Sequence, residues 1–333
     1  MFHRTSQTKN SFINIINMPF KTITKIAAFV ILSLLALTAT ACVDLPNASV
    51  NIKATETGRS FSAPKVSGKI TSDEITESSG LAASKCRGGV LWTHNDSGGG
   101  PFLYAIGTKG ERLETWKVTS AKNIDWEDIA LRKDPDGKCY LYIGDTGNNT
   151  GRRDEFTVYR IPEPAALKKS SSRKMPGETA QAEILRFSYS NRHPDAETLL
   201  VEPFSGSIYV ITKRIYDAAG VFKLKPDFDA DTIQNAEKIA DISVPSIPNG
   251  LLTSGDISPD GKHIVLCDYF AGYELSLGSD KDFDDIWKTT PIKFDLGNRA
   301  QGESAAYSPD GGSIFATSEF KNSALIKVNI ISK

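Results

Sequence analysis

The stretch Gly302-Glu-Ser-Ala-Ala-Tyr-Ser-Pro-Asp-Gly-Gly-Ser-Ile-Phe-Ala-Thr317 decides the fold. It opens with an acid among small and aliphatic residues, turns at Ser308-Pro-Asp-Gly311, and continues into a β-branched and aromatic run. Proline presets φ in such a turn, glycine accepts the left-handed position, and β-branched and aromatic residues favour strands. The stretch is therefore predicted to form a β-hairpin whose first strand begins at a carboxylate.

The same pattern occurs five times along the chain. The acids in the five copies are 50, 70, 59 and 47 residues apart; they are Glu77, Glu127, Glu197, Asp256 and Glu303. A tight turn follows each acidic segment, at residues 85–89, 134–137, 203–206, 258–261 and 308–311. Repeats of this length, each with a hairpin, are typical of the four-stranded antiparallel blades of a β-propeller.

The repeats predict an all-β fold, a single β-propeller of five blades that spans residues 66–333. Six blades are the alternative, which would require the 70-residue unit to be split. We interpret residues 165–180 of that unit, which lack periodicity, as a surface insertion. The last unit has room for three strands, so Val66–Ile70 is expected to supply the fourth and close the ring. No long apolar helical period is present, so few helices are expected.

The first 41 residues have the layout of a secretory signal, with basic residues, no acid and a short apolar run. Ala39-Thr-Ala-Cys42 resembles a lipobox, so Cys42 is expected to carry a lipid that anchors the protein in a membrane. A plain secretory signal with an incidental cysteine is the alternative. Residues 42–65 are predicted to be a flexible tether. Because Val43 stands where the usual inner-membrane retention signal is Asp, we expect an exported protein, lipid-anchored in the outer membrane of a diderm cell envelope.

Composition limits the partners. After residue 41 the chain holds 35 basic and 40 acidic residues, so nucleic acid is not an expected partner. Three cysteines follow Cys42, too few for a disulfide scaffold. Cys86 and Cys139 could pair after export, and the alternative is that these two and Cys267 are buried thiols. We expect a monomer.

In a propeller blade the first strand lines the central channel and begins on the face to which the second strand returns. The acids at the starts of the first strands should therefore meet the polar residues that end the second strands. These residues are His94, Asn95, Asp96, Asp145, Lys213, Arg214, Asp268, Tyr269 and Glu319. The sequence thus predicts one polar mouth to the channel.

Clustered carboxylates cost free energy unless a cation, protons or water compensates. Calcium is the expected ion, because it takes several oxygen ligands in flexible geometry. Its predicted ligands are Glu77, Glu127, Glu197, Asp256 and Glu303. Lys213 and Arg214 could either neutralise this ring or grip an anionic substrate. The structural alternative is that the repeated acids accept hydrogen bonds from backbone amides of the neighbouring blade.

Four strings carry a family resemblance: Glu77-Ser-Ser-Gly-Leu81, Leu91-Trp-Thr-His-Asn-Asp-Ser97, Asp125-Trp-Glu-Asp-Ile-Ala130 and Gln301-Gly-Glu-Ser-Ala305. In this order they resemble the secreted bacterial phytase-like, or esterase-like, β-propellers over residues 70–320. Propeller phytases bind calcium ions through acids at the channel mouth and hydrolyse phosphate esters, so the resemblance implies the same role for the five acids. The chain departs from those phytases in its blade number and in offering few basic residues for a polyphosphate.

Other catalytic signatures, such as a Gly-x-Ser-x-Gly elbow or a zinc motif, are absent from the sequence. His94 and His193 lie beside mouth segments and are candidate acid–base groups. We predict a lipid-anchored propeller that binds a small-molecule or polymeric ligand, or a partner, at a calcium-stabilised acidic mouth. A calcium-dependent phosphoric ester hydrolase, with Lys213 and Arg214 as catalytic anion clamps, is the alternative. A scaffold with an inert channel is a third reading.

Overall fold

The computed structural model describes residues 59–190 and 193–332. The predicted signal, the lipidation site Cys42 and most of the predicted tether lie outside these residues. Within the described part of the chain, no helix has the length and apolar character needed to span a membrane. A short 3-10 helix, η2 (Phe283–Lys288), interrupts the strands.

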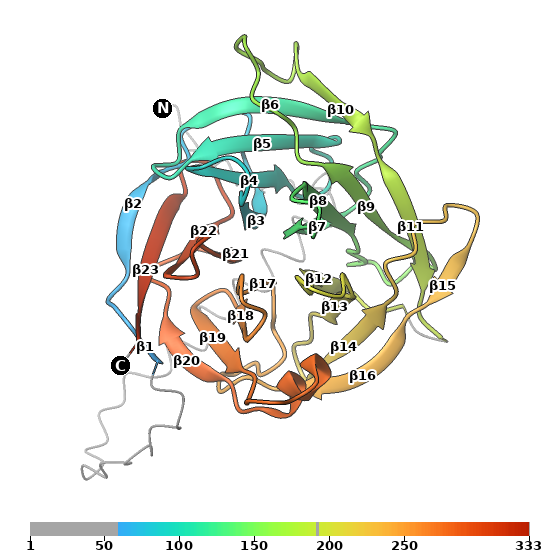
Figure 1. Cartoon of the computed structure of the whole chain (residues 1–333), viewed down its shortest axis with the longest axis vertical. Helices are drawn as coiled ribbons and strands as arrows, with labels where there is room; N and C mark the ends of the chain where they lie inside the picture. Colours follow the sequence, from blue (N-terminus) through green and yellow to red (C-terminus); the bar gives the residue numbers. More distant parts are fainter. Residues whose placement is uncertain (1–58, 191–192, 333) are drawn as a thin grey trace, which may run out of the picture. The chain divides into compact units, whose positions relative to one another are not determined.

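Five β-sheets surround one axis, so the prediction of five blades is confirmed (Figure 1). Blade 1 comprises β3 (Ser78–Ala83), β4 (Val90–Asn95), β5 (Phe102–Gly107), β6 (Arg112–Thr119) and β10 (Gly177–Gln181). Blade 2 comprises β7 (Trp126–Lys133), β8 (Cys139–Asp145), β9 (Phe156–Pro162), β11 (Glu183–Ser188) and β15 (Ile233–Asn235). Blade 3 comprises β12 (Ala196–Val201), β13 (Ile208–Thr212), β14 (Ala219–Leu224) and β16 (Glu237–Ile242).

Blade 4 comprises β17 (Ser254–Ile257), β18 (His263–Cys267), β19 (Ala271–Ser276) and β20 (Ile292–Asp295). Blade 5 comprises β21 (Gly302–Tyr307), β22 (Ser313–Ser318), β23 (Ala324–Ser332), β1 (Arg59–Phe61) and β2 (Lys65–Lys69). In every blade the first strand lies nearest the axis, and the turn between the first two strands is one of the five predicted turns (Figure 1).

The ring closes as predicted, because β2 pairs antiparallel with β23. The closure begins earlier than residue 66, since β1 also pairs with β23. The Arg59 guanidinium lies 3.1 Å from the buried Glu274 carboxylate in blade 4. The predicted boundary between tether and propeller therefore moves from residue 66 to Arg59.

The predicted surface insertion is partly ordered into a strand. Residues 177–181 form β10, which runs parallel to β6 at the outer edge of blade 1. The chain then passes directly into β11, which pairs with β9 in blade 2. The sequence did not indicate this strand, because Gly177 and Gln181 flank a short polar stretch without alternation.

The hydrophobic core consists of five clusters, each shared between two neighbouring blades. Trp92 of blade 1 and Trp126 of blade 2 are fully buried in one of them. A disulfide between Cys86 and Cys139 links the same two blades, and Cys267 is a buried thiol. Of the two alternatives for the cysteines, pairing of Cys86 with Cys139 is the one the structure has.

The first strands are tied together across the axis. In β7, the buried carboxylate of Asp128 accepts hydrogen bonds from the Ser254 hydroxyl of β17 and the Leu199 amide of β12, both at 3.0 Å. Burial raises the pKa of Asp128 well above its usual range, although these hydrogen bonds oppose the rise. This buried carboxylate therefore joins the first strands of blades 2, 3 and 4.

Candidate functional site

Three glutamates occupy the same position at the mouth end of three first strands. In β7, β12 and β21 the second residue is displaced by a β-bulge, and that residue is Glu127, Glu197 or Glu303. A bulge bends its strand and re-aims the displaced side chain. Each of the three glutamates is at least 96% buried.

Aspartates complete two groups of carboxylates around Glu127. Asp96, Asp125 and Glu127 each offer one oxygen, and these oxygens lie within 4.8 Å of one another. Glu127, Asp195 and Glu197 form a second group by the same measure. Blades 1, 2 and 3 therefore contribute to one pocket of oxygen atoms, and both groups include Glu127.

Gly147, in the loop after β8, makes room for this arrangement. A Cβ atom at Gly147 would lie 2.5 Å from the carboxyl carbon of Asp125 and closer still to an oxygen of Glu127. Real Cβ atoms keep at least 3.0 Å from other atoms. The carboxylates can gather here only because this residue has no side chain.

Lys213 enters the same pocket from the end of β13. Its Nζ lies 2.5 Å from Oε1 of Glu197 and 5.2 Å from the ring centre of Tyr269. Burial acts to lower the pKa of Lys213, but Glu197 and other nearby groups raise it well above the usual value. Burial raises the pKa of Glu197 to about 7, although Lys213 opposes the rise. Lys213 thus neutralises part of the ring, one of its two predicted roles.

Glu303 borders this pocket from blade 5. Its Oε1 accepts a hydrogen bond of 2.8 Å from the Gln301 side chain. Burial raises the pKa of Glu303 well above its usual range, and the charges of Glu197 and Glu319 add to the rise. Glu319, which the sequence placed at the mouth, is therefore electrostatically close to the bulged glutamates.

Glu77 and Asp256 do not occupy the bulged position. In β3 and β17 the first two paired residues are consecutive, so these strands have no displaced residue there. Glu77 precedes β3 and is half-buried. Asp256 lies further along β17 and accepts hydrogen bonds from the Tyr307 amide of blade 5 and the Ile257 amide, at 2.9 and 2.8 Å. For Asp256 the structural alternative holds, and its prediction as a mouth ligand is corrected.

Three further residues that were predicted to lie at the mouth accept hydrogen bonds from the backbone amides of nearby loops. Asn95 accepts from the amides of Thr76 and Glu77. Asp145 accepts from the amides before β7 and pairs with Arg153 at 2.8 Å. Asp268 accepts from the amides of the turn that follows it and from the Tyr273 hydroxyl. These side chains fix the loops that carry the pocket.

His94 is enclosed in the protein and lies edge-on to Trp126, with ring centres 5.5 Å apart. Burial lowers its pKa to about 4, so the ring is neutral at physiological pH. The structure thus places His94 in the interior beside Trp126, and its predicted acid–base role stays a prediction.

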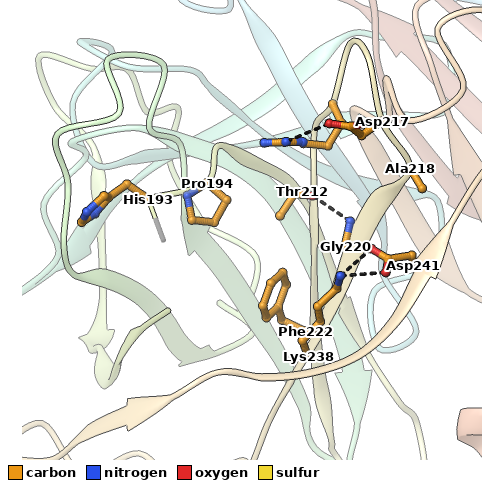
Figure 2. Close-up of a pocket in the computed structure, with 10 residues that line it drawn as sticks. His193, Pro194, Thr212, Asp217, Ala218, Gly220, Phe222, Lys238 and Asp241 are labelled. Carbon is orange, nitrogen blue, oxygen red and sulfur yellow. Dashed lines mark hydrogen bonds and ion pairs between the residues drawn. The ribbon is translucent and has the colours of Figure 1, made fainter. Parts of the chain in front are cut away.

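Arg214 lines a separate pocket of about 590 Å³, together with residues of blade 3 and with His193 and Pro194, which precede that blade in the chain (Figure 2). Its guanidinium lies 3.2 Å from Asp217. Figure 2 shows His193 on the opposite side of this pocket from Lys238, which pairs with Asp241. Arg214 and Lys213 therefore contact different carboxylates and do not form the predicted pair of anion clamps.

Sequence reasoning left Asp195 out of the ligand set and used Asp125 only to mark a repeat. The signal was present, because Asp125-Trp-Glu127 and Asp195-Ala-Glu197 repeat one acidic alternation. Residues two apart in an extended chain face the same side. Both acids of each pair could therefore have been assigned to the mouth.

No family model and no curated protein matches the sequence. Among solved structures, a chain titled Kuenenia stuttgartiensis hydrazine synthase is similar at 12% identity with a TM-score of 0.40. The similarity covers 79% of this chain and 97% of that chain. The sheet topology and the carboxylate groups define this protein as a five-bladed β-propeller with a buried acidic cluster, partly neutralised by Lys213, at one end of its axis.

Proposed function

We propose that this protein is a binding propeller of the cell envelope, anchored by a lipid on Cys42, whose mouth binds calcium and, through it, a ligand. The ion would lie among Asp96, Asp125 and Glu127. Calcium suits this set, because carboxylate oxygens are its preferred ligands and its coordination tolerates flexible geometry.

One observation carries the proposal: three buried acids from two blades bring oxygens within 4.8 Å of one another. Carboxylates this close together repel one another, and a divalent cation between them would offset that repulsion. The bulge at Glu127 and the missing side chain of Gly147 both favour the gathering of these acids.

Exposed apolar side chains on the mouth face support ligand or partner binding. Six exposed apolar side chains lie on loops that join second to third strands, or one blade to the next, all on the mouth face. They are Ile124, Ile215, Tyr216, Ile247, Phe270 and Phe320. Phe320 has a φ of 76°, which is strained for a bulky residue and is common where a side chain is presented for function.

Calcium titration of the purified, chelator-stripped protein tests the ion. Calcium should bind in calorimetry and raise the Tm, and Glu127→Gln should abolish both effects. The matched control is Asp256→Asn, which removes another first-strand carboxylate away from the pocket and should keep the calcium response. A wild-type protein that neither binds calcium nor gains stability from it would refute the calcium site.

The anchor is tested separately in cells. Wild-type protein should incorporate labelled fatty acid and sediment with membranes, whereas Cys42→Ser should do neither. A soluble, unlabelled wild-type protein would contradict the anchor and leave the calcium site unaffected.

A further inference from the structure

Both carboxylate groups at the mouth include Glu127. In the group formed with Asp195 and Glu197, a lysine bonds to Glu197. Lys213 Nζ lies 2.5 Å from Oε1 of Glu197, and both side chains are largely buried. The ring of Tyr269 lies beside the same ammonium at 5.2 Å, in the geometry of a cation–π contact.

A second observation shows that this group is built to hold a cation. Among the described residues, no group donates a hydrogen bond to Oε2 of Glu197, although this atom is buried. Asp195 is held in place by a 2.6 Å hydrogen bond from the Asn148 amide. Lys213 offers one point charge, so it satisfies one Glu197 oxygen and leaves the other.

We propose that the Lys213 ammonium is a tethered cation that takes the place of a second metal ion, so that this mouth holds one divalent ion and not two. The inference rests on the proposed calcium site at Asp96, Asp125 and Glu127. It adds that Lys213 limits the mouth to this one ion. Lys213 then has a defined function: it fixes the number of ions.

This arrangement has a consequence for chemistry. Two-metal hydrolases hold their ions about 3.5–4 Å apart, so that both oxygens of an in-line displacement are stabilised. A second ion would need Glu197 as a ligand, and the lysine ammonium already bonds to that carboxylate. A single ion beside a fixed ammonium suits the binding of an anionic or hydroxyl-rich ligand better than a binuclear displacement.

Counting calcium ions tests the inference. Native mass spectrometry and calorimetry with calcium alone should give one ion for wild type, two for Lys213→Met and one for Lys213→Arg. The matched control is Lys85→Met, which removes a half-buried lysine near Asp256 and should leave the count at one.

Two ions in the wild-type protein would overturn the inference, even if no variant folds. One ion in both wild type and Lys213→Met, with unchanged affinity, would also overturn it. If wild type binds none but Lys213→Met gains calcium binding and a calcium-dependent rise in Tm, the proposed function fails and the tethered cation is supported. If neither protein binds calcium, both proposals are refuted.

Discussion

Replacement of Gly147 by alanine is the sharpest test of the mouth geometry. The new Cβ would lie 2.5 Å from the carboxyl carbon of Asp125, whereas carbon atoms in contact stay about 3.5–4 Å apart. The Asp125 and Glu127 carboxylates must therefore shift by about 1 Å. Calcium ligands lie at about 2.3–2.6 Å, so a shift of this size removes ligands from the ion. We expect calcium affinity to fall about 100-fold, or about 2.8 kcal/mol.

The assay is the gain in stability on adding calcium, measured by urea unfolding. At a calcium concentration 100 times the wild-type Kd, wild type should gain about 2.7 kcal/mol. Gly147→Ala should gain only about 0.4 kcal/mol at the same concentration, because its Kd then equals the calcium concentration. Gly88→Ala is the matched control, since a Cβ at Gly88 meets no atom within 4 Å. An equal calcium gain in Gly147→Ala and wild type would refute the assigned geometry.

Three further outcomes are expected. The double variant Cys86→Ala/Cys139→Ala, which removes the disulfide, should lower the free energy of unfolding by about 4 kcal/mol, because the bond closes a loop with a sequence separation of 53. A loss below about 1 kcal/mol in urea unfolding would contradict this expectation. Arg59→Met leaves the buried Glu274 carboxylate without its cation and should cost about 3–5 kcal/mol in the same assay; a change near zero would show that β1 does not hold the ring closed. Burial raises the pKa of Asp256 from 3.8 to about 6, although Lys85 opposes the rise, so the folded state binds more protons than the unfolded state between these values. Wild type should therefore lose about 2 kcal/mol relative to Asp256→Asn as the pH rises from about 4 to 6, and parallel stability curves for the two proteins would contradict the shift.

The candidate site could be predicted only in part. The sequence predicted Glu127, Glu197 and Glu303 as residues of the site, because each occupies the same position in its repeat. Asp256 matched the same pattern and was wrong as a ligand, because β17 lacks the bulge that displaces the other acids. A bulge depends on how the first strand pairs with the second strand. The sequence of the first strand alone does not specify that pairing.

The ion pairs and the disulfide could also be assigned only from the tertiary structure. Lys213 and Arg214 are adjacent in sequence, yet one side chain enters the pocket and the other pairs with Asp217 outside it. Successive side chains near a strand end point to opposite sides, and which side is buried depends on the neighbouring blade. Pairing of Cys86 with Cys139 likewise needed two blades to bring the atoms together.

The sequence by itself predicted the β-propeller and the closing of the ring by the N-terminal strand, and it favoured five blades over six. Turn residues and β-branched runs act locally, and their repetition leaves few folds that bury every strand. Only the tertiary structure decided which acids share a pocket, because that depends on bulges, a glycine gap and the packing of blades from distant parts of the chain. Carboxylates converge where strands from different repeats meet, and a linear pattern does not specify those distances.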